Sequence, residues 1–272
     1  MSLLEILGFS AAVMIGVSLG LIGSGGSILT VPILVYLIGV SPVMATAYSL
    51  LVVGATSLVG AIHNIKRGFV NIRAAVIFSI PSFISVFITR RFIMPMLPDH
   101  IGNLGSLVLT KDLLIMMIFA VLMVVTSISM IRHGRVKESE NHEAVKFNYP
   151  MIFLEGAVIG AITGFVGAGG GFLIIPALVV FSRLPMRIAV GTSLLIIAIK
   201  SLIGFSGDLY SAATMNWPML IVFTVLAVAG IFIGAKLSLK IPGQRLKPVF
   251  GWFVLVMGIY IVVKELLKAQ YI

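Results

Sequence analysis

The sequence predicts an all-α polytopic membrane protein made of two homologous repeats, each an interrupted helix followed by three transmembrane helices. First, 60% of its 272 residues are hydrophobic and only 10% are charged, with a mean hydropathy of +1.18, whereas soluble domains carry about 25% charged residues. Second, a glycine-rich motif closed by a proline occurs twice, as GLIGSGGSILTVP (20–32, the first glycine motif) and GFVGAGGGFLIIP (164–176, the second glycine motif). Third, three apolar stretches follow each motif in the same order.

The predicted elements are long enough to cross a bilayer, since a transmembrane helix needs about 20 apolar residues. The interrupted stretches are expected at 4–38 and 151–181, and the spans that follow them at 44–63, 74–92 and 112–131, and at 188–207, 217–236 and 248–264. No Lys or Arg precedes the first apolar stretch. We therefore expect it to belong to the mature protein and not to be a cleavable signal peptide, which needs a positive N-terminal region.

The two halves correspond beyond the glycines. At a spacing of 144, the segment ATAYSLL (45–51) aligns with AVGTSLL (189–195). We divide the chain into a first transmembrane repeat (1–133), a polar linker loop (134–149) and a second transmembrane repeat (150–272). Duplication of this kind is common in secondary transporters, whose binding sites lie where the repeats meet.

Basic residues bear on how the interrupted stretches sit in the membrane. A helix over Leu4–Ile38 would be about 50 Å long, which exceeds the ~30 Å hydrocarbon core. The stretch therefore either crosses once with a break or enters and returns as a re-entrant hairpin. Single crossings divide Lys and Arg nine to nine, leaving out Lys200. Re-entrant hairpins place thirteen on one side and five on the other. The positive-inside rule favours hairpins, inverted repeats and external termini.

The glycine motifs are candidate anion-binding sites. Irregular backbone at membrane depth is tolerated only inside protein or beside a wet cavity. Where a helix breaks, the amides of the following helix lack intrahelical partners and attract anions. Close helix packing is the structural alternative for such glycines, and a nucleotide site is excluded because no Lys-Ser/Thr follows them. The candidate binding residues are Gly23, Ser24, Gly25, Gly26, Ser27, Gly167, Gly169, Gly170 and Gly171.

The span after the second glycine motif carries a polar face. Ser193, Lys200 and Gly204 are spaced by 7 and 4 residues, which places them on one side of a helix. Lys200 lies about thirteen residues into the span, too deep to reach the surface easily, and a charge there marks a functional site by default. The alternatives are a structural ion pair with Asp208 or a lysine made neutral by burial.

The matching span of the first half has Thr56 at the position of Lys200, so the predicted site is asymmetric. The residues expected to complete the binding site are Ser49, Thr192, Ser193 and Lys200. The candidates for coupling transport to an ion are His63, Asp208 and Glu155, although His63 also fits an ordinary interfacial residue near a helix end.

These motifs resemble those of the sulfite exporter TauE/SafE family, also called the TSUP permeases. The resemblance rests on GLIGSGGSILTVPIL with SPVMATAYSL, and on GFVGAGGGFLIIPAL with LPMRIAVGTSLLIIAIKSLIGFSGDL, and it covers essentially the whole chain. The first copy departs at Ser27, where the family usually has glycine, and at Tyr48, where it often has threonine. The resemblance implies an inner-membrane permease of about eight membrane segments for sulfur-containing anions such as sulfite or sulfonates.

The combined expectation is a secondary transporter that exports small sulfur-containing anions across the cytoplasmic membrane by alternating access. The alternative is an uncoupled small-anion channel built from the same repeats. An enzyme is not expected, because the histidines of the sequence, the residues best suited to act as a base, fall at or beyond span ends. We expect no cofactor, metal or nucleic acid. The expected partners are the anion, the bilayer and a co-transported proton or sodium ion; the oligomeric state is left open.

Overall fold

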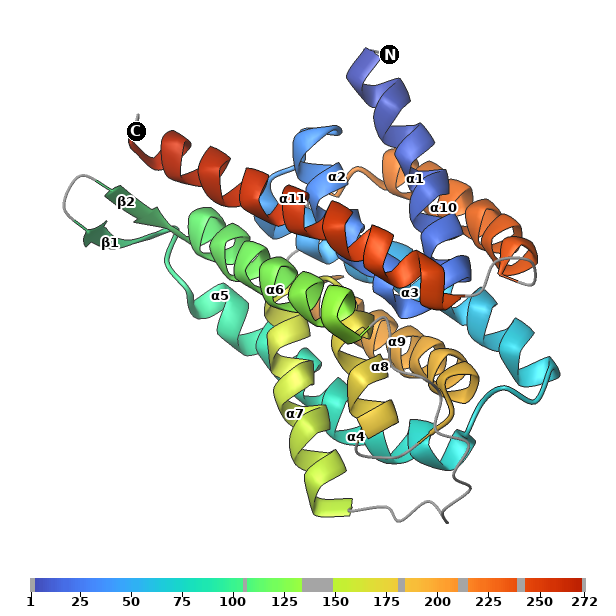
Figure 1. Ribbon diagram of the computed structural model, residues 1–272. Coiled ribbons are helices and arrows are strands. Elements are labelled where there is room, and N and C mark those ends of the chain that lie inside the picture. The colour runs from blue at the N-terminus through green and yellow to red at the C-terminus, as the bar shows by residue number, and fades with distance from the viewer. Residues whose placement is uncertain are drawn as a thin grey trace.

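The computed structural model describes residues 3–104, 107–133, 149–180, 184–209, 215–238 and 243–270. Helices dominate it (Figure 1). The first half contains α1 (Leu3–Ile22), the 3-10 helix η1 (Ser24–Leu29), α2 (Thr30–Tyr36), α3 (Pro42–Lys66), α4 (Ile72–Ile88), the π-helical turn η2 (Thr89–Ile93), α5 (Met94–Met96), β1 (His100–Leu104), β2 (Leu107–Thr110) and α6 (Lys111–His133). The second half contains α7 (Tyr149–Val166), α8 (Gly171–Val180), α9 (Met186–Asp208), α10 (Trp217–Leu237) and α11 (Gly243–Gln270).

The membrane spans follow the prediction. Within the described residues, six helices are long and apolar enough to cross a bilayer, and they are those of the six ordinary spans. Both interrupted stretches are broken at their glycine motifs. The first comprises α1, η1 and α2, and the second comprises α7 and α8. The chain is therefore an all-α, multi-pass membrane protein.

The β1–β2 hairpin was not predicted. The two strands pair antiparallel, with Asn103 opposite Val108, and they extend from one end of the molecule beside the start of α6 (Figure 1). A short polar connection with few β-branched residues gives too weak a pattern to identify such strands from the sequence.

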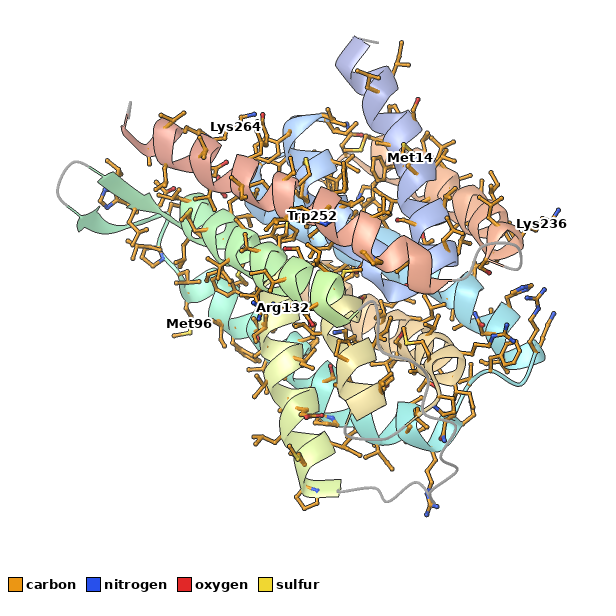
Figure 2. The ribbon with its side chains drawn as sticks, viewed as in Figure 1. Met14, Met96, Arg132, Lys236, Trp252 and Lys264 are labelled. Atoms are coloured by element: carbon orange, nitrogen blue, oxygen red, sulfur yellow. The ribbon has the colours of Figure 1, made fainter. Side chains whose placement is uncertain are left out.

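The burial pattern is the reverse of that of a soluble protein, because large apolar side chains face outward and polar side chains are buried. Large apolar side chains such as Met14, Met96 and Trp252 point outward from the helices (Figure 2), with exposed fractions of 69%, 82% and 57%. By contrast, α3 and α9 pack against each other at the centre of the protein. In their most apolar segments, 72% of the residues of α3 and 67% of those of α9 are buried. Serine and threonine side chains are buried in this centre, as expected when lipid and not water surrounds the outer helices.

The first interrupted helix turns back on itself. α1 ends at Ile22, and Gly23 takes a φ of 77°, a left-handed conformation that favours glycine. A methyl group added at Gly8, near the start of α1, would contact Ile38, which follows α2, and one added at Gly26 would contact Leu19. The η1–α2 arm therefore runs antiparallel to α1.

The second interrupted helix breaks in a different conformation. α7 ends at Val166, and Gly167, Gly169 and Gly170 take φ values of 73°, 64° and 66° before α8 begins. In Figure 1, α1 and α7 start at opposite ends of the molecule and both run toward its centre, where α8 turns back toward the end from which α7 came. The first break thus uses one left-handed glycine, and the second uses three.

Contacts between the halves recur at a nearly constant sequence offset. Gly16 of α1 packs against Ala227 of α10, and Gly160 of α7 packs against Ser82 of α4. The first residues of these two contacts are 144 positions apart and the second residues 145 positions apart. Each interrupted helix therefore packs against the second ordinary span of the other half: α1 packs against α10, and α7 packs against α4.

Hydrogen bonds between the halves follow the same rule. The backbone N–H of Asn71 donates to Thr192 Oγ1 over 2.9 Å, and that of Asn216 donates to Tyr48 Oη over 2.7 Å. Corresponding residues again make corresponding contacts. Both bonds lie at the starts of helices whose N-caps are the asparagine side chains, so each cap is fixed to the opposite half.

Candidate functional site

The two glycine motifs meet at the centre of the protein. A methyl group added at Gly169 would lie 3.6 Å from Ser27 Cβ. Gly23 packs against Val190 of α9, and Gly167 packs against Thr46 of α3. Since no side chain covers the backbone at these glycines, other groups approach it closely.

Lys200 reaches the second glycine motif from α9. Its side chain is only 1% exposed, and Nζ donates a hydrogen bond to Thr163 Oγ1 over 2.9 Å. A methyl group added at Gly170 would lie 3.0 Å from the same Nζ atom. The structure therefore brings Lys200 and Gly170 together, although they are 30 residues apart in the chain.

No counter-ion compensates Lys200 within the described part of the chain, where no carboxylate lies within 4.0 Å of Nζ. The interpretation that Lys200 pairs with Asp208 is wrong, because Asp208 Oδ2 lies 3.4 Å from Nη1 of Arg90. Lys200 and Asp208 are eight residues apart on one helix, which separates their Cα atoms by about 12 Å. An ammonium group has three donors, and Thr163 occupies one of them.

Arg90 is a second buried cation, and it lies at the start of the same motif. Its Nη1 donates to Thr46 Oγ1 over 3.0 Å, and Thr46 packs directly against Gly167. Arg90 is 2% exposed. The second glycine motif therefore has Arg90 near Gly167, through Thr46, and Lys200 near Gly170.

The span expected at 74–92 has Arg90 near its end, and Arg90 was not among the predicted site residues. The helical backbone instead continues through η2 to Met96, so Arg90 stays inside the protein. A π-helical turn adds a residue to one helical turn and is frequent at functional sites. The usable signal was the apolar run FIMPM directly after the arginines, which shows that the span does not end there.

The surroundings of the first glycine motif lack these charges. The polar residues around the second motif are Thr46, Arg90, Thr163 and Lys200. The residues at the corresponding positions around the first motif are Val190, Ala235, Leu19 and Thr56. The contacts of the two halves correspond, but the charged chemistry is confined to the second motif. The predicted asymmetry at Thr56 and Lys200 therefore extends to the whole surroundings of the motif.

The remaining predicted binding residues differ in their contacts. Thr192 accepts the hydrogen bond from Asn71 that joins the halves, and Ser193 Oγ donates to Val190 O over 2.8 Å. Within the described residues, the buried hydroxyl of Ser49 has no hydrogen-bond partner. Gly25 and Gly26 lie in η1, and Gly171 begins α8. Ser24 begins η1, and its side chain lies outside the described part.

Of the three coupling candidates, Asp208 contacts the polar residues around the second motif, through Arg90. His63 is half-buried near the end of α3, and Glu155 is half-buried on α7. Neither forms an ion pair within the described residues. The same part of the chain contains no group of three or more His, Asp or Glu side chains that could hold a metal ion.

Two adjoining cavities lead toward Arg90. The outer cavity has a volume of about 520 Å³ and is lined by the starts of α3 and α6 and the end of α11. The inner cavity has a volume of about 220 Å³ and is lined by Arg90, Asp208 and Lys111, among others. Val43, Met44 and Lys111 line both cavities, so the two are neighbours that adjoin at these residues.

Comparison with known proteins identifies the family. Residues 8–261 match the family described as Sulfite exporter TauE/SafE. The chain belongs to this TauE/SafE family. It is 30% identical over 253 residues to a probable membrane transporter protein of Xylella fastidiosa, a match that covers 92% of this chain and 91% of the relative. No solved structure matches the chain.

Two further relatives come from a bacillus and an archaeon, as their organism names show. The probable membrane transporter protein YunE of Bacillus subtilis is 27% identical over 239 residues, which cover 81% of this chain and 82% of the relative. A probable membrane transporter protein of Methanocaldococcus jannaschii is 24% identical over 272 residues, covering 95% and 94%. Together with the six apolar helices, these names identify the chain as a multi-pass membrane transporter and point to transport rather than catalysis.

Proposed function

We propose that this TauE/SafE protein is a secondary transporter that exports small sulfur-containing anions, such as sulfite or organosulfonates, across the cytoplasmic membrane. We further propose that the anion binds at the second glycine motif beside Lys200. One observation carries the proposal: the buried Nζ of Lys200 lies at Gly170 with no carboxylate within 4.0 Å among the described residues.

The physics of burial explains why this arrangement suits an anion. An unpaired charge costs several kcal/mol when it is removed from water, and an anion bound beside a protonated Lys200 would offset that cost. Thr163 fixes the direction of the ammonium group. The break before α8 leaves backbone amides without intrahelical partners at the same place, and helix N-termini bind anions.

Alternating access has a structural basis in the proposed repeats. We infer that 1–133 and 150–272 are inverted copies, because their contacts correspond at offsets of 144 and 145 and because α1 and α7 enter from opposite ends (Figure 1). Transporters of this kind expose a central site to each side in turn when one repeat rocks against the other. The second glycine motif lies between the halves, where such a motion would act.

Flux measurements test the proposal. The purified protein is reconstituted into proteoliposomes, and the movement of ³⁵S-labelled sulfite is followed with and without a proton or sodium gradient. We expect the gradient to drive sulfite against its concentration difference and unlabelled sulfonates to compete. Movement only down the concentration difference would show the alternative, an uncoupled channel. If no sulfite or sulfonate moves, the proposed substrate class is wrong.

A further inference from the structure

We propose that the inner cavity is a second anion site, distinct from the one at Lys200, and that a small monoanion with a planar or pyramidal oxyanion group binds there to the free edge of the Arg90 guanidinium. This site rests on the proposed function only for the class of its ligand. The transported anion would bind there transiently between the central site at Lys200 and the outer cavity.

The hydrogen bonding of Arg90 supports the site. Nη1 bonds to Thr46 and faces Asp208, but Nε and Nη2 are buried and have no hydrogen-bond partner among the described residues. These two nitrogens form one edge of the guanidinium, and their N–H groups point the same way. That edge matches two oxygens of one oxyanion. Since both nitrogens are covered in this conformation, an anion in the inner cavity reaches them only when the side chains around Arg90 move apart. Buried donors without partners are rare because each carries a desolvation cost.

The contact between Asp208 and Arg90 is longer than a charge-assisted hydrogen bond. The distance from Arg90 Nη1 to Asp208 Oδ2 is 3.4 Å, whereas a charge-assisted hydrogen bond measures about 2.7–2.9 Å. Asp208 Oδ2 also lacks a hydrogen-bond partner. The carboxylate therefore balances the charge of Arg90 without occupying its Nε and Nη2 donors, and it competes with an incoming anion for the same cation.

The net charge of the lining residues favours an anion in the inner cavity over one in the outer cavity. Arg90 and Lys111 against Asp208 give the charged residues lining this cavity a net charge of +1, which a monoanion neutralises. The outer cavity contains Lys111 and Lys268 but also three carboxylates, so its excess is negative. A volume of about 220 Å³ is several times the ~30 Å³ share of one water molecule, which is enough for a small oxyanion.

The test uses the purified full-length protein with Lys200→Gln as background, so that binding at the central site is weakened. Sulfite binding is measured by isothermal titration calorimetry. We expect Lys200→Gln to retain saturable binding, and Arg90→Lys in that background to weaken it roughly tenfold or more, because lysine keeps the charge but lacks the two-donor edge. Arg91→Lys is the matched control, since Arg91 lines neither cavity.

A second variant should change the affinity for sulfite in the opposite direction. In the Lys200→Gln background, Asp208→Asn should tighten sulfite binding roughly tenfold, because a competing carboxylate of similar size is removed. A purely structural ion pair would instead give a less stable protein with unchanged or weaker binding. Unchanged affinity in Arg90→Lys, or weaker binding in Asp208→Asn, would overturn the second site.

The outcomes also separate this site from the proposed function. If Lys200→Gln alone abolishes all sulfite binding, the Lys200 site stands and the Arg90 site is wrong. If Lys200→Gln changes nothing and Arg90→Lys in the wild-type protein removes binding, the Arg90 site stands and the Lys200 site is wrong. If the wild-type protein binds no sulfite, both are wrong.

Discussion

At the scale of single residues, two buried cations distinguish this protein from an apolar helix bundle. The depth of Lys200 in a predicted span was sufficient to identify it as a candidate from the sequence. Arg90 could not be found in the same way, because its burial depends on a π-helical turn that carries the helix on to Met96. Its partner Thr46 comes from another helix, and one sequence gives no information about that contact.

Replacing Lys200 with alanine should reduce the initial rate of sulfite transport about tenfold or more, because a charge-assisted hydrogen bond contributes about 1.5–3 kcal/mol. The rate is measured in proteoliposomes at matched protein content. Lys236→Ala is the control, since Lys236 is exposed and points away from the end of α10 (Figure 2). Equal rates for both variants would remove Lys200 from the mechanism.

Replacing Gly170 with alanine should abolish sulfite binding. The new methyl group would contact Thr163 and lie 3.0 Å from Lys200 Nζ, and the φ of 66° is unfavourable for alanine. Gly25→Ala is the control change in the first motif, at a position where φ is not positive and the closest neighbour, Ile22 Cγ2, is 3.3 Å away. Calorimetry should show binding retained in Gly25→Ala. Equal loss in both variants would favour close packing as the role of both motifs.

At the scale of helices, hydropathy predicted the spans well, and glycine patterns predicted the breaks. Each span contains enough apolar residues to identify it without knowledge of its neighbours. The conformations of the breaks could not be predicted. The first motif forms a 3-10 helix after Gly23, whereas the second has three left-handed glycines. The two motifs also contact different side chains. The β1–β2 hairpin also escaped prediction, since its strands are short and weakly patterned.

Glycines outside the breaks have a packing role that mutation should reveal. A side chain at Gly230 of α10 would meet the backbone of Val13 and Val17 on α1. Gly230→Val should therefore separate the two helices and destabilise the protein by about 1–3 kcal/mol, the usual cost of overpacking. Thermal unfolding in detergent measures the loss. Gly102→Ala, where no atom lies within 4 Å of the added methyl group, should leave the unfolding temperature unchanged.

At the scale of the whole molecule, the sequence predicted two repeats, but it did not predict which helices of one half pack against the other. Alignment pairs residues such as Asn71 with Asn216, yet it does not predict that each caps a helix while bonding to the opposite half. Those contacts depend on the three-dimensional arrangement of all the helices. The resulting symmetry of contacts surrounds charged residues that lie on the side of the second glycine motif, at Arg90 and Lys200.

Membrane topology separates the two arrangements of the interrupted helices. The chain has no cysteine, so Arg67→Cys and Lys236→Cys each introduce one unique thiol at an exposed position. If both interrupted helices are re-entrant, a membrane-impermeant maleimide applied to intact cells should label neither thiol until the cells are permeabilised. Under single crossings the two positions lie on opposite sides, so labelling of only one thiol in intact cells would contradict the inverted-repeat proposal.

The central claim is that an anion binds at the second glycine motif beside Lys200, and an anomalous-scattering map tests it most directly. Crystals of the protein grown with selenite, the selenium counterpart of sulfite, would locate the ligand by its selenium signal. We expect a peak next to Gly170, with an oxyanion oxygen about 2.8 Å from Lys200 Nζ. A map in which selenium occupies another place, with Lys200 bonded only to protein, would contradict it.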